Sequence, residues 1–255
     1  MIPHDDRGLL LGDGLFETML ARDGALPHLS AHLDRMAAGC AALDLPFDRL
    51  AAEAACRAAA PAEGRFAVRL TLTSGSGGRG LDRPVPPAPR LFATAAPAAP
   101  VTAPARLAVA TTRRNEGSPA ARLKTLSYLD NVLARAEATA AGGDEAVMLN
   151  NRGELACAGA ANLFWIADGR LFTPRLSCGA LAGITRARLM ARRPVEEVAA
   201  GPDVLDRAEA LFLTNSLIGV RPVSRLGDRT FEPHRLAEDL RAALEGGAPS
   251  ARRRP

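Results

Sequence analysis

The chain has 255 residues, enough for one large domain or two smaller domains with separate hydrophobic cores. Hydrophobic residues make up 47% of it and charged residues 24%, which excludes collagen-like, disordered and disulfide-scaffold proteins. The net charge of +4 is comparable to the terminal cluster Arg252–Arg254, and aromatic residues are 4% of the chain, so we expect no nucleic-acid partner.

Membrane and metal binding are not expected either. The longest apolar run, Ala156–Ala167, is too short to cross a bilayer, and residues Met1–Arg7 lack the basic and apolar regions of a signal peptide. We therefore expect a cytoplasmic protein. The four cysteines form no CxxC pair, and His28 and His32, one helical turn apart, have no third ligand nearby.

The first third of the chain predicts a mixed α+β domain. Apolar side chains recur at helical spacing from Leu29 to Leu43, and they alternate from Phe66 to Leu72 as in a half-buried strand. The next segment, Gly75–Gly80, fits the GxGxxG pattern of dinucleotide-binding turns, but the proline-containing residues Leu81–Pro87 cannot follow it as a helix. We predict a flexible loop, which is either a plain glycine turn or a segment that closes over a substrate carboxylate through Arg79.

The segment Pro84–Pro104, rich in proline and alanine, predicts the connection between two domains. We place a small α+β domain at residues 1–104 and a larger domain at residues 105–255. In the larger domain Asp168-Gly169 predicts a hairpin turn. The predicted strands are 107–109, 146–149, 154–158, 162–166 and 211–213, and the predicted helices are 128–141, 185–192 and 234–245. This mixed order favours an α+β fold over a doubly wound parallel sheet.

The chain contains a single lysine, Lys124, among 32 basic residues. A guanidinium stays protonated and cannot act as the neutral amine that forms an imine, so this lysine is a candidate catalytic residue. The only tyrosine, Tyr128, lies four residues later. If a helix begins near them, the amine could form a Schiff base while the phenol binds the phenolate oxygen of a cofactor in the same site.

Two later segments are typical of phosphate binding. Small residues at Gly179–Gly183 precede a predicted helix, and Asn215-Ser216 follows a predicted strand. The free amides of Ile184 and Thr185 at the helix N-terminus, together with the Ser216 hydroxyl, would bind a phosphate dianion.

These motifs together resemble the class IV aminotransferases, the fold type IV pyridoxal-phosphate enzymes, over nearly the whole chain. Asp13–Thr18 resembles the GDGxFET segment at the start of the family, and His32–Met36 resembles its HLxRL helix, whose arginine binds the cofactor phosphate. Lys124 corresponds to the Schiff-base lysine. The resemblance implies a small α+β domain, a larger pseudo-barrel domain, pyridoxal 5'-phosphate between them, and a homodimer whose loops complete the substrate pocket.

The resemblance also implies the roles of individual residues. Lys124 is the expected catalytic residue, and Arg79 and Arg114 are expected to bind a substrate carboxylate. The expected cofactor-binding residues are Arg35, Tyr128, Cys157, Asn162, Gly183, Ile184, Thr185, Asn215 and Ser216. No metal is expected.

One position departs from the family pattern. The family places a glutamate five residues before Asn162, where it binds the pyridine nitrogen, and this chain has Cys157 there. Glu154 cannot replace it without a bulge, because an odd offset along a strand points to the opposite face. Two interpretations stay open: a thiolate that pairs with a protonated ring, or an inert packed thiol.

The reaction is less constrained than the fold. The family includes branched-chain and D-amino-acid aminotransferases and 4-amino-4-deoxychorismate lyase. Ser74–Gly80 resembles the lyase loop, whereas Leu126–Tyr128 also suits aminotransferases. We predict a pyridoxal-phosphate-dependent aminotransferase acting on an amino acid and a 2-oxo acid. The alternatives are the lyase, which serves folate and 4-aminobenzoate synthesis, and a weakly active or non-catalytic member that lacks the pyridine-binding glutamate.

Overall fold

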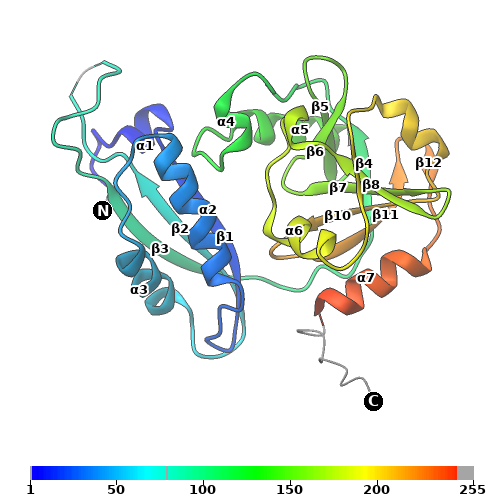
Figure 1. The fold of residues 1–255 in the computed structure, drawn as a ribbon, viewed down its shortest axis with the longest axis horizontal. Helices are drawn as coiled ribbons and strands as arrows, with labels where there is room; N and C mark the ends of the chain where they lie inside the picture. Colours follow the sequence, from blue (N-terminus) through cyan, green and yellow to red (C-terminus); the bar gives the residue numbers. More distant parts are fainter. Residues whose placement is uncertain (1, 79, 246–255) are drawn as a thin grey trace.

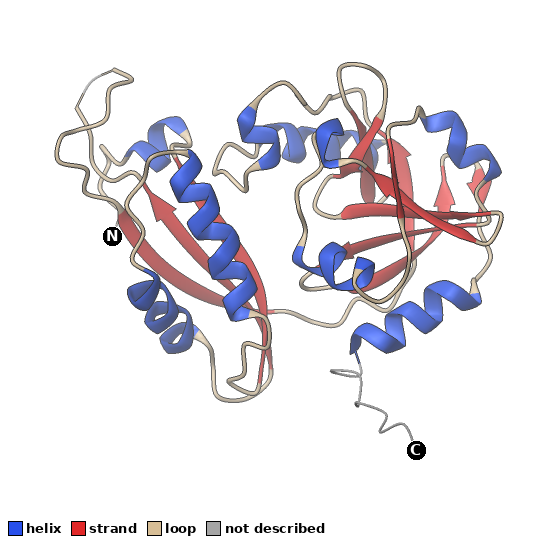
Figure 2. Ribbon diagram, viewed as in Figure 1, coloured by secondary structure: helices blue, strands red, loops and turns tan. Residues whose placement is uncertain are grey.

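The computed structural model describes residues 2–78 and 80–245, which form two lobes, each built on its own sheet (Figure 1). The N-terminal lobe contains the antiparallel strands β1 (Gly14–Arg22), β2 (Arg65–Thr73) and β3 (Arg90–Pro97) in that spatial order. Its helices are α1 (Arg7–Leu11), α2 (Leu29–Ala42) and α3 (Arg49–Ala59). Figure 2 shows α2 and α3 on one face of this sheet, where α2 packs on β1 and α3 on β2 and β3.

The core of this lobe follows from the sequence pattern. Leu33, Met36 and Cys40 recur at helical spacing on α2 and are fully buried. Val68 and Leu70 of β2 are also fully buried, because alternate residues of a strand point to the same face. The apolar side chains that the sequence pattern assigns to the helix and to the strand therefore pack together in one core layer.

The C-terminal lobe is a curled sheet of nine strands (Figure 2). Its strands are β4 (Ala105–Val109), β5 (Glu145–Leu149), β6 (Leu155–Ala158), β7 (Asn162–Ala167), β8 (Arg170–Pro174), β9 (Glu196–Val198), β10 (Ala210–Asn215), β11 (Gly219–Leu226) and β12 (Arg229–Thr230). They lie in the order β6-β5-β4-β11-β10-β7-β8-β9, with β12 beside β11. The pairs β4–β5, β4–β11 and β8–β9 are parallel and the others antiparallel, which confirms the mixed α+β prediction.

Helices cover this curled sheet. They are α4 (Pro119–Arg122), α5 (Leu129–Ala140), α6 (Ile184–Met190) and α7 (Arg235–Glu245), with 3₁₀ turns at Leu176–Cys178 and Pro202–Arg207. The predicted hairpin between β7 and β8 is present: Asp168 and Gly169 both have positive φ, 50° and 66°, as a two-residue type I′ turn requires. Among residues 2–78 and 80–245, no helix is long and apolar enough to cross a membrane.

The predicted connection at Pro84–Pro104 needs a correction. Residues Arg90–Pro97 form β3, and the chain that joins the two sheets is residues 98–104. β3 lies at the edge of its sheet and most of its side chains are partly or fully exposed, so it lacks the apolar alternation that identifies a strand from sequence. Its hydrogen bonds to β2 define it instead.

Candidate active site

A pocket of about 340 Å³ is lined by residues from both lobes. The N-terminal lobe contributes Phe16, Thr18, Arg35 and Arg69. The C-terminal part of the chain contributes Arg114, Lys124, Tyr128, Asn131, Cys157, Ala158, Ala160, Ala161, Asn162, Leu181, Gly183, Ile184, Thr185, Thr214, Asn215, Ser216 and Leu217. Every described residue that the sequence predicted for the site therefore lines this one pocket.

Lys124 lies in the segment between α4 and α5, where its backbone pairs with β1. The Phe16 amide donates to the Lys124 carbonyl at 2.9 Å, and the Leu126 amide donates to the Gly14 carbonyl at 3.0 Å. The Lys124 Nζ atom lies 4.1 Å from the Phe16 ring centroid and 5.2 Å from that of Tyr128. The predicted meeting of lysine and tyrosine is present, but not through helical spacing, because α5 begins only after Tyr128.

The environment of Lys124 favours its neutral amine. Burial lowers the pKa of this lysine, and although the Glu17 carboxylate opposes the shift, the guanidinium groups of Arg35, Arg69 and Arg114 add to it. The resulting pKa is about 8, against an ordinary 10.5. A nucleophilic amine must be unprotonated, and with this pKa about a tenth of Lys124 is neutral at pH 7 and about half at pH 8.

The charges of the pocket are one-sided. Lys124 and three arginines, Arg35, Arg69 and Arg114, line it, and no aspartate or glutamate is among the described lining residues. Glu17, behind the lining, pairs with Arg35, so the four cations outnumber this one carboxylate and the net positive charge favours anionic ligands. The pocket is therefore suited to a ligand, or a pair of ligands, that carries several negative charges.

Two of the three arginines are held by the protein. Arg35 donates from Nε and Nη2 to the two carboxylate oxygens of Glu17, each at 2.7 Å, and from Nη1 to the Ala182 carbonyl of the other lobe at 2.8 Å. Arg114 is buried and donates to the Ala121 carbonyl at 2.6 Å and to Asn131 Oδ1 at 3.0 Å.

Arg69 differs from both and was not predicted from the sequence. Its guanidinium carbon lies 3.7 Å from the Phe16 ring centroid, and no described residue accepts a hydrogen bond from it or forms an ion pair with it. Its neighbours Val68 and Leu70 are buried in the core, so alternation along β2 points Arg69 to the opposite face. This alternation is the feature of the sequence that could have identified Arg69 as a residue outside the core.

A phosphate cradle fits the end of the pocket near α6. This helix begins after Gly183 with no side-chain N-cap, and Thr214 Oγ1 nearby in the lining is buried without a partner among the described residues. A Cβ at Gly183 would lie 2.0 Å from Asn162 Oδ1, so the close approach of the chain there requires glycine. An unpartnered buried hydroxyl beside free helix amides fits a phosphate group.

Cys157 lies at the end of β6 and is buried in the pocket lining. Burial raises the pKa of its thiol to about 11, so the neutral thiol dominates at physiological pH. This favours the second of the two interpretations left open by the sequence. The pairing of β5 with β6 has a register shift between Met148 and Leu149, yet Glu154 lies outside the pocket lining and accepts hydrogen bonds from Asn150 and Arg152.

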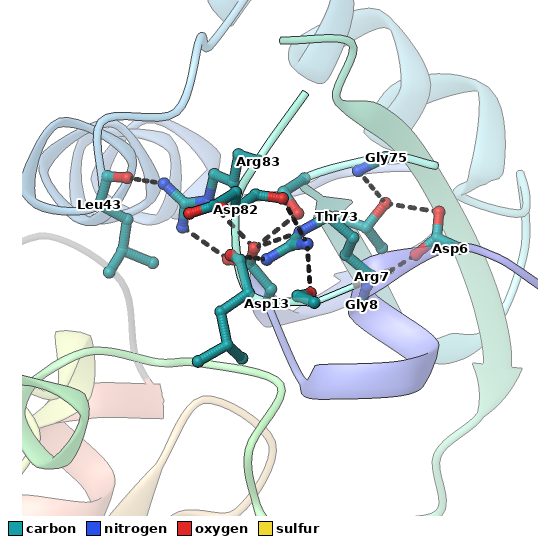
Figure 3. A network of polar contacts seen from close by, with 12 residues as sticks. Asp6, Arg7, Gly8, Asp13, Leu43, Thr73, Gly75, Asp82 and Arg83 are labelled. Atoms are coloured by element: carbon teal, nitrogen blue, oxygen red, sulfur yellow. Dashed lines mark hydrogen bonds and ion pairs between the residues drawn. The ribbon is translucent and has the colours of Figure 1, made fainter. Parts of the chain in front are cut away.

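The glycine-rich loop lies away from the pocket, at the far end of the N-terminal lobe (Figure 1). Figure 3 shows the buried Arg7 beside Asp82, next to this loop. The guanidinium donates to the carbonyls of Gly80, Leu81 and Asp82 at 3.4, 2.7 and 3.0 Å. No described residue of the loop lines the pocket of its own chain. Arg79, predicted to bind a substrate carboxylate, lies outside the described residues.

Residues 14–226 match the family model described as amino-transferase class IV. The chain belongs to the class IV aminotransferase family. Family members are pyridoxal-phosphate-dependent aminotransferases or aminodeoxychorismate lyases, so this protein is an enzyme, as predicted. Within the part of the chain that the structure describes, no three His, Cys, Asp or Glu side chains gather as a metal site.

Relatives of this class IV chain include both reaction types. It is 31% identical to the aminodeoxychorismate lyase of Vibrio harveyi, over 88% of this chain and 86% of the relative. It is 32% identical to a provisionally named branched-chain-amino-acid aminotransferase of Methanocaldococcus jannaschii, over 91% and 85%. The crystal structure of 4-amino-4-deoxychorismate lyase from Pseudomonas aeruginosa is 32% identical, with a TM-score of 0.86 over 96% of this chain and 95% of that one.

Proposed function

We propose that the protein binds pyridoxal 5'-phosphate in this pocket, attached through Lys124, and acts on the amino group of a substrate that carries carboxylates. The observation that carries the proposal is a partly buried lysine with a pKa of about 8 in a pocket lined by cations and by no described carboxylate. Tyr128, beside the amine, is suited to bind the cofactor's phenolate oxygen.

The phosphate end of the cofactor would lie in the cradle near α6. We assign Arg35 and the hydroxyl of Ser216 as side-chain ligands and the amides of Ile184 and Thr185 as backbone ligands. Thr214 Oγ1, which is buried without a partner among the described residues, is a further candidate. Asn215 and Asn162 support the cradle: Asn215 Oδ1 accepts from the Leu217 and Ile218 amides, each at 2.9 Å, and Asn162 Nδ2 donates to the Leu181 carbonyl at 2.8 Å.

The substrate would bind opposite this cradle, against the N-terminal lobe. Arg69 presents a guanidinium with no described partner, which is the chemistry that recognises a carboxylate in a two-pronged geometry. Arg114 lines the pocket as a second cation, although its guanidinium already donates to Asn131 and Ala121. A substrate with two carboxylates matches this pair better than a monocarboxylate does.

Of the two reactions in the family, we propose the lyase reaction on 4-amino-4-deoxychorismate. Bound pyridoxal phosphate supplies an electron-withdrawing ring that stabilises negative charge on the carbon next to the amine. Lys124 would take the proton from that carbon, after which the bond between the neighbouring ring carbon and the enolpyruvyl oxygen breaks and the substrate ring becomes aromatic. The released enolpyruvate takes up one proton, which Lys124 can return, and becomes pyruvate. The electron pair leaves with the pyruvyl oxygen. This reaction therefore depends less than transamination does on stabilisation of negative charge by the cofactor ring.

That difference matters because of Cys157. We infer that this residue faces the pyridine nitrogen, where a neutral thiol does not hold a proton by charge as a carboxylate does. Transamination, in which the electron pair returns through the cofactor ring, is therefore the second candidate. The similarity to the relative from Methanocaldococcus jannaschii, which is named as an aminotransferase, supports this second candidate.

Two measurements test the proposal. Borohydride reduction of the chain loaded with pyridoxal phosphate, followed by peptide mapping, should place the adduct on the peptide that contains Lys124. The rate of attachment should rise with pH through about 8, because the amine loses its proton there. Pyruvate released from aminodeoxychorismate without an added 2-oxo acid supports the lyase, whereas conversion of the cofactor to its amine form by an amino acid supports the aminotransferase.

We further propose a homodimer. Leu9 and Leu10 of α1 and Leu129 and Val132 of α5 are each at least 59% exposed, and Leu9 and Leu129 line the same shallow surface depression. Large apolar side chains exposed on two neighbouring elements favour an interaction site. Sedimentation of the chain should give a dimer that Val132→Glu dissociates. A cytoplasmic location stays a prediction, to be checked by fractionation of expressing cells.

A further inference from the structure

A buried carboxylate–imidazole pair lies behind the phosphate cradle. Glu17 of β1 and His32 of α2 are each 1% exposed, and His32 Nδ1 lies 2.7 Å from Glu17 Oε2. The other ring nitrogen, Nε2, lies 3.2 Å from the hydroxyl oxygen of Ser216, which lines the pocket from the C-terminal lobe. The three groups thus form a hydrogen-bonded chain from the core of one lobe to the ligand pocket at the other.

The direction of the first hydrogen bond is fixed by chemistry. Burial disfavours ionisation of Glu17, but hydrogen bonds from Arg35 and His32 outweigh it, and the pKa of Glu17 lies below its ordinary value. The carboxylate is therefore ionised and can only accept. Nδ1 of His32 must carry a proton and donate to it, which leaves Nε2 as the nitrogen that can change its protonation.

The state of Nε2 sets the direction of the Ser216 hydroxyl. When Nε2 is unprotonated it accepts the hydroxyl proton, and Ser216 can only accept from the pocket. When Nε2 is protonated it donates to Ser216 Oγ, and the hydroxyl proton is free to donate into the pocket. A phosphate or sulfate group accepts hydrogen bonds, so only the second state suits it.

The charged and titratable groups around His32 come from its own helix and from two other segments. Glu17 faces it from β1, Arg35 lies on its own helix, and Lys124 faces Glu17 from the segment before α5. His28, one turn earlier on α2, interacts electrostatically with His32 and with Arg188 and Arg192. The one carboxylate in this set, Glu17, is shared with Arg35, so an anion in the pocket adds a negative charge on the opposite side of the ring.

We propose that His32 is a positioning residue of the phosphate cradle: binding of a phosphate-type anion is coupled to uptake of one proton by His32, which turns the Ser216 hydroxyl toward the ligand. The proposal rests on the phosphate site of the proposed function. It assigns to the buried histidine a role in ligand affinity and not only in packing.

Inorganic sulfate is the probe, because it does not itself titrate from roughly pH 5.5 to 7, where a histidine changes its charge. The titrations are kept in this range because Lys124 of the same pocket, with a pKa of about 8, stays mostly protonated there. Calorimetric titration of the full chain with sulfate, in two buffers with different ionisation enthalpies, measures the protons taken up. Where free His32 is neutral, uptake of one proton weakens sulfate binding about tenfold for each unit rise in pH. Loss of binding in Arg35→Ala places the sulfate in this pocket.

Two variants separate positioning from packing. His32→Gln should bind sulfate with no proton uptake and with a flat pH profile, and Ser216→Ala, which leaves the buried pair intact, should weaken binding most at low pH and flatten the profile. His234→Gln is the matched control, because His234 also contacts a carboxylate, that of Glu209 at 3.3 Å, away from the pocket. It should keep the wild-type profile.

Two results would overturn the proposal: sulfate binding to the wild type without proton uptake, and a wild-type pH profile in Ser216→Ala. Both remain decisive if His32→Gln fails to fold. The test is independent of the reaction. Proton-coupled sulfate binding in a chain that never forms an adduct at Lys124 would refute the proposed function and leave this inference standing.

Discussion

Two clusters of arginine in this protein differ in how their charge is balanced. In the N-terminal lobe, Asp13 accepts from Arg7 Nε at 3.0 Å and from Arg83 Nε and Nη2 at 3.0 and 2.5 Å (Figure 3). It also accepts from Ser74 Oγ at 2.8 Å, and the other guanidinium nitrogens of Arg7 and Arg83 donate to backbone carbonyls. In the pocket, Arg69 has no partner among the described residues, and no described carboxylate belongs to the lining.

This difference separates arginines that stabilise the fold from an arginine that is available to bind a ligand. A buried arginine whose donors are all occupied fixes the chain, as Arg7 fixes the loop at Gly80–Asp82. Arg69 is exposed to solvent in the free chain and has no protein acceptor among the described residues, so its donors are available to a bound anion. The loop cluster should therefore govern stability and the pocket cluster should govern binding, and each can be tested without the other.

The largest effect is expected for Lys124→Arg. The variant keeps a positive charge in the pocket but has no amine that can become neutral, so turnover should fall by at least about a thousandfold. Steady-state kinetics and the visible spectrum of the loaded protein measure this loss. Thermal unfolding without the cofactor should be nearly unchanged, and an equal loss of folding would instead make Lys124 a structural residue.

Asp13→Ala should destabilise the protein by about 3 kcal/mol, because it leaves the buried Arg7 without its carboxylate. Denaturant unfolding measures the change. Asp34→Ala is the matched control: Asp34 pairs with Arg49 on the surface, where 64% of its side chain is exposed, and its loss should cost less than about 1 kcal/mol. Cofactor affinity should be the same in both variants.

The same aspartate gives a pH prediction with a definite sign. The hydrogen bond from Arg83 lowers the pKa of Asp13 from 3.8 to about 2, against the opposing effect of burial. Its contribution to stability is thus fully present above about pH 4 and is lost as the pH falls toward 2. In Asp13→Ala this acid-dependent part of the unfolding free energy should disappear.

Arg69→Gln should raise the KM for the substrate by roughly 10- to 100-fold, the equivalent of a charge-assisted hydrogen bond of about 1.5–3 kcal/mol. Cofactor binding, followed by the visible spectrum, should change little. Arg57→Gln removes an exposed arginine of α3 and serves as the control. An unchanged KM in Arg69→Gln would place the substrate carboxylate elsewhere.

The smallest effect is expected for Cys157→Ala. A neutral thiol contributes little charge to the ring, so the rate of pyruvate release should stay within about threefold of the wild type. A loss of about a hundredfold would show that the thiol is ionised when the ligand is bound. Cys157→Glu should act in the opposite direction on transamination and raise that half-reaction by about tenfold, since a carboxylate stabilises a protonated ring.

The sequence predicted those parts of the site that a single residue type can identify. Lys124 was found because it is unique, and Arg35 and the turn at Gly183 because they lie in ordered motifs. Arg69 was missed because one arginine among so many carries no signal until the core side of β2 is known. The role of Glu17 depends on its pairing with His32 and Arg35, which exists only after α2 has packed on β1.

The prediction of the fold also depended on how clear the pattern of each element is in the sequence. Helix α2 and strand β2 bury a full apolar face and were recognised, whereas β3 buries little and was taken for a connection. Helix α1 has only five residues and leaves Leu9 and Leu10 exposed, so its residues lack an amphipathic pattern. The periodicity of apolar residues in a sequence predicts elements that bury one face. Elements that are stabilised mainly by hydrogen bonds lack this pattern and are not predicted from it.

The backbone pairing of Lys124 with β1 has a mechanical consequence. The lysine belongs to the C-terminal part of the chain by sequence, yet its carbonyl is hydrogen-bonded to the N-terminal lobe, while Gly183 and Ser216 belong to the other sheet. A molecule attached to Lys124 and held by that cradle would link the two lobes in addition to the connecting residues 98–104. Limited proteolysis of this connection should therefore be slower in the loaded protein than in the free chain, because separation of the lobes would require release of the ligand.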